Sequence, residues 1–224
     1  MDILELIKER KSIRCYKPDI PARELVLECL EAASWAPNPT SQQPWQFIVL
    51  TGDTLKKVCD VIQGNYAAAS AQKVQGEPEQ PKNDVAEILE KRKKDNFAEM
   101  ISFLQETNAD MQAIGEGNFN FHRAPVAVLF GVWPCKDQNY LKSTIAAMQN
   151  FMLTATARGL GTCWANAVSI CQDAIKKSLN LHESLILADG VSVGYPAADE
   201  PVNKIPRHRL AVEEVTIWHN QKML

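Results

Sequence analysis

The sequence predicts an α+β fold in which helices cover a mixed β-sheet. Residues 125–132 carry no polar side chain, which is typical of a central strand buried on both faces. Several other segments place apolar residues at helical spacing. The connections between the expected strands are long enough to contain these helices, so we expect about four or five strands and five or six helices in one packed unit.

Composition favours a single domain over residues 1–224. The 224 residues carry a net charge of −3, with 46% hydrophobic and 23% charged residues, which is ordinary for a globular protein. The longest nearly uncharged apolar stretch, residues 124–135, is too short to span a bilayer, and the charged N-terminus does not resemble a signal peptide. The acidic balance gives no electrostatic reason to bind nucleic acid. We therefore expect neither a membrane nor a nucleic acid as a partner.

Cysteine and histidine usage points to the cytoplasm and away from a metal site. The six cysteines include no pair at CxxC spacing, and a chain of this length can bury a core without disulfides. We read them as reduced thiols. The four histidines are dispersed and lack ligand spacing, so no metal is expected.

The first half of the chain alternates helix, loop and strand. A helix is expected from Asp2 and must end before Pro18, and a second helix follows Pro21. The proline-rich residues 36–44 predict a shaped loop, residues 46–51 a buried strand, and the residues from Thr54 a helix. Residues 64–83 are weakly patterned and are expected to be loop-like.

Residues 84–107 are helical in composition and contain the run KRKK at 91–94. Acidic residues flank this run on both sides, so a solvated helix face is favoured over a phosphate or nucleic-acid site. Five aromatic residues in and around this part of the chain are read as core in preference to pocket walls: Tyr66, Phe97, Phe103, Phe119 and Phe121.

The second half begins with the apolar strand at 125–132. A helix over 143–158 is stopped by Gly159, and a short helix is expected over 171–178. Residues 185–194 and 212–218 predict two further strands, separated by an irregular basic segment. Gly190, inside the first of these strands, indicates a bulge or a close contact.

Two groups of basic residues are candidates for binding an anion. Arg10, Lys11, Ser12 and Arg14 follow the first helix, and guanidinium and hydroxyl groups are good donors to phosphate. The alternative is that these cations only complement the dipole of the helix C-terminus. Arg207 and Arg209 flank one residue in an extended stretch and could close on the same anion.

Two further segments are candidates for binding a flat heterocyclic ligand. The loop residues Pro37, Asn38, Thr40, Ser41 and Gln43 offer hydrogen-bonding groups on a stiff backbone, although an ordinary loop anchored by Trp45 would have the same composition. The glycines at 159 and 161 lead into Cys163, Trp164, Ala165 and Asn166, where a ligand could approach the backbone closely. Neither a Rossmann nor a Walker motif is present, and Cys163 is read as a packed, inert thiol.

Taken in order, these segments resemble the nitroreductase family of FMN-dependent oxidoreductases. The resemblance lies in six motifs that cover nearly the whole chain except about residues 60–118. They are R-[RK]-S-x-R at 10–14, the A-P…Q-P-W loop at 36–45, A-P-V at 124–126, Q-N at 149–150, G-L-G-[ST] at 159–162, and G-Y-P followed by basic residues and E-E-V at 194–215. In the loop, Ser41 stands where the family has Asn, and Asn38 where it usually has Ser.

The resemblance implies a three-layer fold with a central mixed, largely antiparallel sheet, and a homodimer with FMN at the interface. Arg10, Ser12 and Arg14 with Arg207 and Arg209 would hold the FMN phosphate and ribityl chain. The loop from Pro37 to Ser41 would come from the partner subunit, with help from Gln43. The backbone of residues 163–166 would face the flavin ring, and the lid would lie at about 60–118. Reduced nicotinamide, NADH or NADPH, would deliver a hydride to flavin N5 for a small acceptor, and no side chain is implied as an acid or base.

Several functions remain open on this reading. The favoured one is a cytoplasmic NAD(P)H-oxidising reductase of nitroaromatic, quinone or enone-like acceptors. A specialised relative on the same fold, such as a reductive dehalogenase or a flavin-consuming enzyme, is one alternative. A flavin-binding store or sensor without turnover is another.

Overall fold

A computed structural model describes residues 2–76, 84–136 and 139–219. Its sheet has the strand order β1-β2-β4-β3, and all three pairings are antiparallel. The strands are β1 (Trp45–Thr51), β2 (Val126–Val132), β3 (Gly161–Ala165) and β4 (Ile186–Gly194). One isolated parallel bridge, between Ser12 and Thr162, extends the sheet beyond β3. The expected α+β class and largely antiparallel sheet are confirmed.

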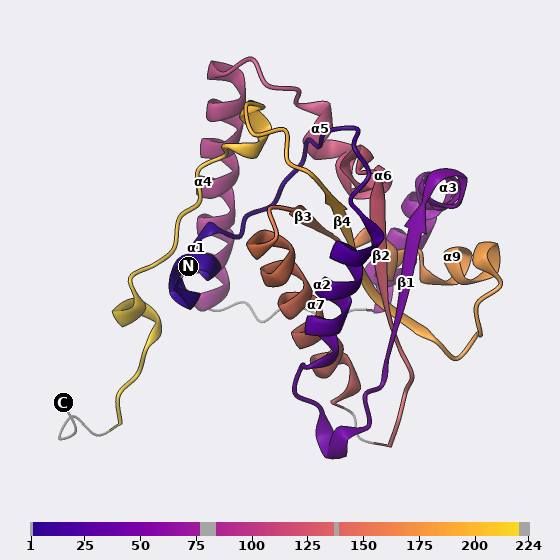
Figure 1. Cartoon of the computed structure of the whole chain (residues 1–224). Coiled ribbons are helices and arrows are strands. Elements are labelled where there is room, and N and C mark those ends of the chain that lie inside the picture. Colours follow the sequence, from indigo (N-terminus) through magenta and orange to yellow (C-terminus); the bar gives the residue numbers. More distant parts are fainter. Residues whose placement is uncertain (1, 77–83, 137–138, 220–224) are drawn as a thin grey trace.

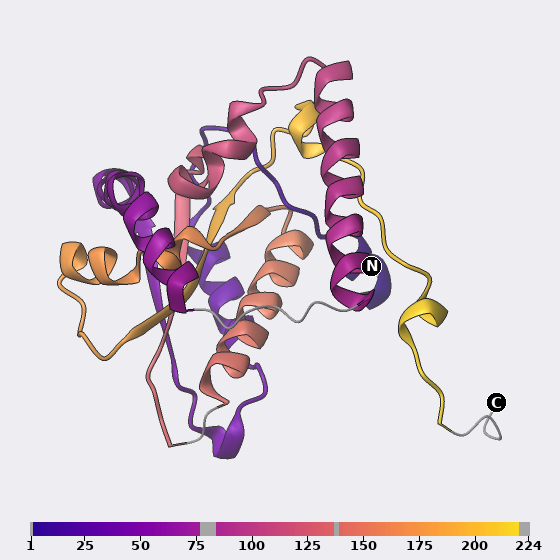
Figure 2. The ribbon, with the colours of Figure 1, turned by 180° about the vertical axis from the view of Figure 1, so that it is seen from behind.

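Helices cover both faces of this sheet, as Figures 1 and 2 show from opposite sides. Successive residues of β2 point to opposite faces, so Val128 packs in one core and Leu129 in the other. The first core lies under α2 (Arg23–Ser34) and α7 (Tyr140–Ala157). The second lies under α3 (Gly52–Gly76), α8 (Ala167–Ile170) and α9 (Gln172–Leu179). The strand at 126–132 is buried at every position, as its composition predicts.

The remaining helices lie beside these layers. α1 (Ile3–Glu9) and α4 (Asp84–Glu106) lie at one side of the molecule, where the C-terminal segment runs past them (Figure 1). Short helices α5 (Gln112–Gly115) and α6 (Gly117–Asn120) lead to β2, and 3-10 turns occur at Pro39–Ser41, Phe121–Arg123, Pro201–Asn203 and Val212–Val215. On α4, exposed ion pairs join Lys91 to Asp95 and Lys93 to Glu90, which confirms the solvated face.

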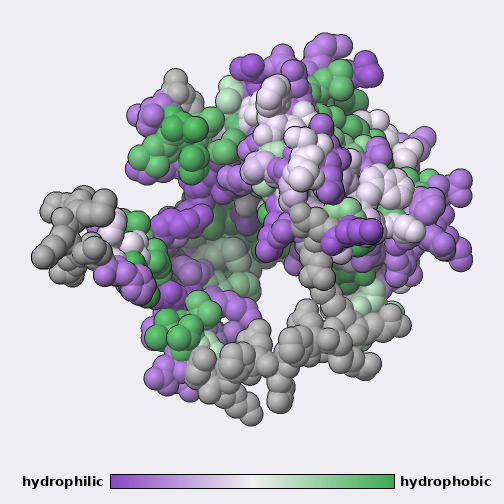
Figure 3. Space-filling view, turned by 90° about the horizontal axis from the view of Figure 1, so that it is seen from below, coloured by the Kyte–Doolittle hydropathy of each residue, from purple (hydrophilic) through white to green (hydrophobic). Residues whose placement is uncertain are grey.

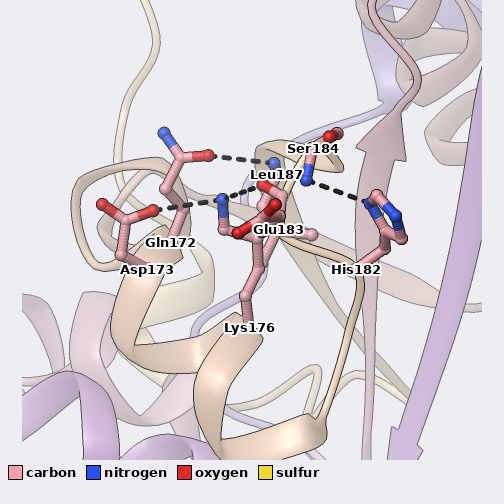
Figure 4. A network of polar contacts seen from close by, with 7 residues as sticks. All are labelled: Gln172, Asp173, Lys176, His182, Glu183, Ser184 and Leu187. Atoms are coloured by element: carbon pink, nitrogen blue, oxygen red, sulfur yellow. Dashed lines mark hydrogen bonds and ion pairs between the residues drawn. The ribbon is translucent and has the colours of Figure 1, made fainter.

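A polar network fixes the turn between α9 and β4 (Figure 4). The Oε1 atom of Gln172 accepts a hydrogen bond from the backbone N–H of Leu187 at 3.3 Å. Lys176 donates to the carbonyl oxygen of Glu183 at 2.9 Å and pairs with Asp173 at 3.1 Å. The network therefore joins this helix to the start of the strand.

Five expectations differ from the structure. Two concern burial: the strand at 46–51 is an edge strand that is mostly not buried, with Val49 45% exposed, and Phe97, expected in the core, is 59% exposed on α4. The other three concern secondary structure. Residues 64–76 continue α3 and do not form a loop, because alanines, glutamine and lysine favour helix even where the apolar pattern is weak; residues 77–83 lie outside the described residues. The strand at 161–165 was not expected, because a five-residue strand after two glycines has too little periodicity to detect. The strand predicted at 212–218 is wrong: residues 212–215 form an exposed 3-10 turn, and within the described chain this segment pairs with no strand.

Candidate functional site

The two groups of cations meet at one cavity of about 300 Å³. It lies between the end of α1, the segment 203–209 and α4. Its wall includes Arg10, Lys11, Ser12, Arg14, Asn203, Arg207, His208 and Arg209, with Asn96, Glu99 and Met100 from α4. The basic residues of this set are those that the sequence predicts to bind an anion. The structure shows that they lie around one cavity.

The segment that carries Ser12 and Arg14 is held against the edge of the sheet. The backbone N–H of Ile13 donates to the carbonyl oxygen of Thr162 in β3 at 2.9 Å. Ile13 packs directly on Gly161, where an added Cβ would lie 2.7 Å from its Cγ1 atom. Glycine at 161 therefore allows the close approach, and the backbone after α1 brings Ser12 and Arg14 to the cavity wall.

Arg207 closes the site from the C-terminal side. Its guanidinium donates to the carbonyl oxygens of Arg10 and Lys8, the latter at 2.7 Å. These carbonyls lie at the C-terminus of α1, where backbone acceptors lack helical partners. Arg207 thus has the capping role that the sequence raised as an alternative for residues 10–14. Arg209 instead donates to the neighbouring carbonyl of His208 and, among the described residues, has no hydrogen bond to α1.

The cations repel one another. The pKa of Arg10 is lowered, first by burial and then by the charges of Arg207 and Arg209. A bound anion would attract each of these cations and so offset the repulsion between them. The site therefore fits a phosphate group, which several guanidinium groups can bind at once.

A second cavity of about 680 Å³ adjoins the first and shares Arg10, Ser12, Arg207 and Arg209 with it. Gln149 and Met152 of α7 and Trp164 of β3 contribute to its wall. The indole of Trp164 is fixed by a 2.8 Å hydrogen bond from its Nε1 atom to Asp189. A phosphate group in the first cavity and a flat ring system in the second would fit these residue types.

The residues on either side of Trp164 differ in burial and in hydrogen bonding. Cys163 and Ala165 are buried in the sheet. Burial raises the pKa of the Cys163 thiol, against the opposing effects of Arg14 and Ser12, so the thiol is protonated and inert near neutral pH. The side chain of Asn166 accepts a 2.6 Å hydrogen bond from Asn118 of α6.

These features agree with comparisons to known proteins. The model of the nitroreductase family matches residues 7–195. The chain belongs to the nitroreductase family. A putative NADH dehydrogenase/NAD(P)H nitroreductase of Methanothermobacter thermautotrophicus is 40% identical over 88% of this chain and 78% of its own length. The 4-nitrobenzoate reductase of Pseudomonas putida is 27% identical over 91% of this chain and 89% of its own.

Solved structures show the same fold. The FMN-dependent nitroreductase NfnB of Mycobacterium smegmatis, crystallised in complex with NADPH, superposes with a TM-score of 0.78 at 21% identity. The match covers 97% of each chain. The nitroreductase fold is therefore shared along almost the entire chain.

In this nitroreductase-family chain the polar loop lies away from the cations. None of Pro37, Asn38, Thr40, Ser41 and Gln43 contributes to the two cavities. The loop is nevertheless specifically shaped: Thr40, Ser41 and Gln43 have positive φ angles near +50°, and the side chain of Asn38 accepts a 2.8 Å hydrogen bond from the backbone N–H of Gln43. Its predicted role would require a second subunit.

Sequence reasoning missed part of the site. Gln149 belongs to the Q-N motif but was not recognised as a cavity residue, and Met152 lies one turn further along the same helix. α4 lies within the segment 60–118 that the family resemblance gives as the lid, but no pattern singled out its cavity residues, because Glu99 reaches the cavity through a 2.8 Å contact with His208, 109 residues away. The helices of the described residues include none with the length and apolar composition of a membrane span.

Proposed function

We propose that this protein is an FMN-dependent oxidoreductase that passes electrons from NADH or NADPH to a nitroaromatic, quinone or enone-like acceptor. The observation that carries the proposal is the meeting of Arg10, Ser12, Arg14 and Arg209 at one cavity beside a larger one walled by Trp164. The names of the relatives, which include nitrobenzoate and NAD(P)H nitroreductases, support the same reaction class.

The chain's own residues bind and orient in this proposal. Arg10, Arg14 and Arg209 would hold the phosphate, and Ser12 would donate a further hydrogen bond. Trp164, fixed by Asp189, would form part of the wall beside the ring. When bound, FMN would supply the redox chemistry by accepting a hydride at N5 and passing electrons on. We assign no side chain as an acid or base.

We further propose that two subunits complete the site, with the loop from Pro37 to Ser41 supplied by the partner. Apolar side chains on three neighbouring segments support an extensive interface. Ile3 and Leu4 of α1 are 71% and 53% exposed, and Ile217 and Trp218 near the C-terminus are 82% and 63% exposed. Val85, Ile88, Leu89 and Phe97 on α4 are also exposed. Seen from below, green apolar patches border a hollow on the side that carries the C-terminal segment (Figure 3). Exposed apolar surface of this kind is typical of an interface.

The first experiment records the visible spectrum of the purified protein and identifies the released chromophore by chromatography. Yellow protein that releases FMN at about one per subunit, as a phosphate cavity in each subunit predicts, would support the cofactor. Colourless protein that also fails to take up FMN would contradict it. Light scattering should give the mass of a dimer, and a monomer with tightly bound FMN would contradict the shared site.

Turnover then separates the possible functions. Steady NADH or NADPH oxidation that depends on an added nitroaromatic would support the reductase. Flavin binding without turnover would favour a store or sensor, and turnover confined to halogenated aromatics would favour a dehalogenase. The cytoplasmic location proposed from the cysteine content can be checked by fractionation.

A further inference from the structure

Asn203 is a buried polar residue that joins the two halves of the cation site. It is 2% exposed and lies in the 3-10 turn Pro201–Asn203. Its Oδ1 atom accepts hydrogen bonds from the backbone N–H groups of Arg14 at 2.7 Å and Cys15 at 3.1 Å. Its Nδ2 atom donates to the carbonyl oxygens of Cys15 at 2.8 Å and Ala197 at 2.9 Å.

These four bonds use the whole capacity of the amide. A carboxamide has two donor hydrogens and two acceptor lone pairs, and in Asn203 each has a backbone partner. Although Asn203 borders the first cavity, it has no donor left for a phosphate oxygen. Its contribution must therefore come through the residues that it holds.

The residues that it holds are those that face the anion. Arg14 is a direct backbone partner, and Arg207 and Arg209 follow a few positions after Asn203 in the chain. The two segments are also joined on either side of Asn203. The backbone N–H of Ala197 donates to the carbonyl oxygen of Cys15 at 3.1 Å, and the guanidinium of Arg207 binds the backbone at the end of α1. Between these two connections, the amide of Asn203 holds the backbone of Arg14 itself, so it contributes to the spacing between Arg14 and Arg209.

We propose that Asn203 is a positioning residue for phosphate binding, which sets the spacing between Arg14 and Arg209 without touching the ligand. This inference rests on the proposed binding of FMN. A charged hydrogen bond depends strongly on distance and angle, so a small shift of either arginine weakens the phosphate contact. A purely structural role would instead lower protein stability and affect all ligands of the site alike.

Riboflavin separates these two roles, because it carries the same ring and ribityl chain as FMN but lacks the phosphate. We would prepare apoprotein by removing the flavin, then titrate FMN and riboflavin separately and follow flavin fluorescence. The variants are Asn203→Ala, which loses all four bonds, and Asn203→Ser, whose hydroxyl can keep part of them. Gln172→Ala is the matched control, since it also removes a bond from a side-chain amide to the backbone, at the turn between α9 and β4 (Figure 4).

For Asn203→Ala we expect the Kd of FMN to rise about tenfold while that of riboflavin changes by less than about twofold. Asn203→Ser should fall between this variant and the natural protein, and Gln172→Ala should leave the ratio of the two Kd values unchanged. Thermal unfolding of each apoprotein verifies that the variants are folded; should Asn203→Ala be unfolded, the ratio in Asn203→Ser decides.

Failure of the proposed function and failure of the positioning role give different results. If the natural protein binds FMN no more tightly than riboflavin, the phosphate site and with it the proposed function are wrong. If the natural protein prefers FMN and the folded Asn203 variants keep the same preference, the proposed function stands and the positioning role is refuted.

Discussion

Arg209 is the cation whose removal should affect ligand binding most selectively. It borders both cavities, it adds to the repulsion that lowers the pKa of Arg10, and it has no bond to α1. Arg209→Ala should therefore weaken FMN binding without destabilising the apoprotein. A hydrogen bond to a charged group contributes about 1.5–3 kcal/mol, and because Arg209 is exposed we take the lower end, which corresponds to about a tenfold higher Kd.

The assay is a fluorescence titration of apoprotein with FMN at two salt concentrations. Arg23→Ala is the matched control, because it removes the same charge from an exposed position at the start of α2, outside both cavities. The difference between the two variants should shrink at high salt, since salt screens exposed charges. Equal FMN affinities for the two variants at low salt would refute the role assigned to Arg209.

Three further changes test other parts of the structure. Gly161→Ala should lower the free energy of unfolding by about 1–3 kcal/mol and weaken FMN binding, because the new Cβ would collide with Ile13, whereas Gly64→Ala, with open space around it in α3, should be neutral or stabilising. Arg207→Ala should lower both FMN affinity and melting temperature, because two hydrogen bonds to the end of α1 are lost; an unchanged melting temperature would contradict this. Burial raises the pKa of Cys29 from 9.0 to about 11, so between these pH values the unfolded chain loses a proton that the folded chain keeps, and stability should fall by about 2–3 kcal/mol as pH rises. Urea unfolding at pH 8 to 11 should show a shallower decline for Cys29→Ala, and parallel declines would refute the assignment.

Local patterns predicted much of the fold. The strand at 126–132 and the helix α7 have periodicities that depend only on neighbouring residues, and both were expected close to their observed bounds. The cation groups were also recognisable as candidates for anion binding from residue type alone. Gly190 was expected at a close contact, and an added Cβ there would lie 2.7 Å from Val168.

Features that depend on partners distant in the chain were missed or misread. The strand β3 is short, and its existence depends on pairing with β4. The alternating residues 212–218 have the composition of a strand, but strand formation also needs a neighbouring edge, and within the described residues none pairs with them. The same dependence on distant partners explains why Gln149 and Glu99 were not expected at the cavities.

Side-chain chemistry and local spacing were enough to predict which residues could bind an anion and which segments could fold around them, because both can be recognised without knowing the distant contacts of the chain. The tertiary fold brings Arg10 and Arg209 to one cavity, and it places Arg207, which also borders that cavity, where it binds the end of α1. It also decided that Asn203 joins the two segments, through bonds to residues 188 and 189 positions away. Such convergence depends on how the chain closes on itself, and no local pattern contains that information.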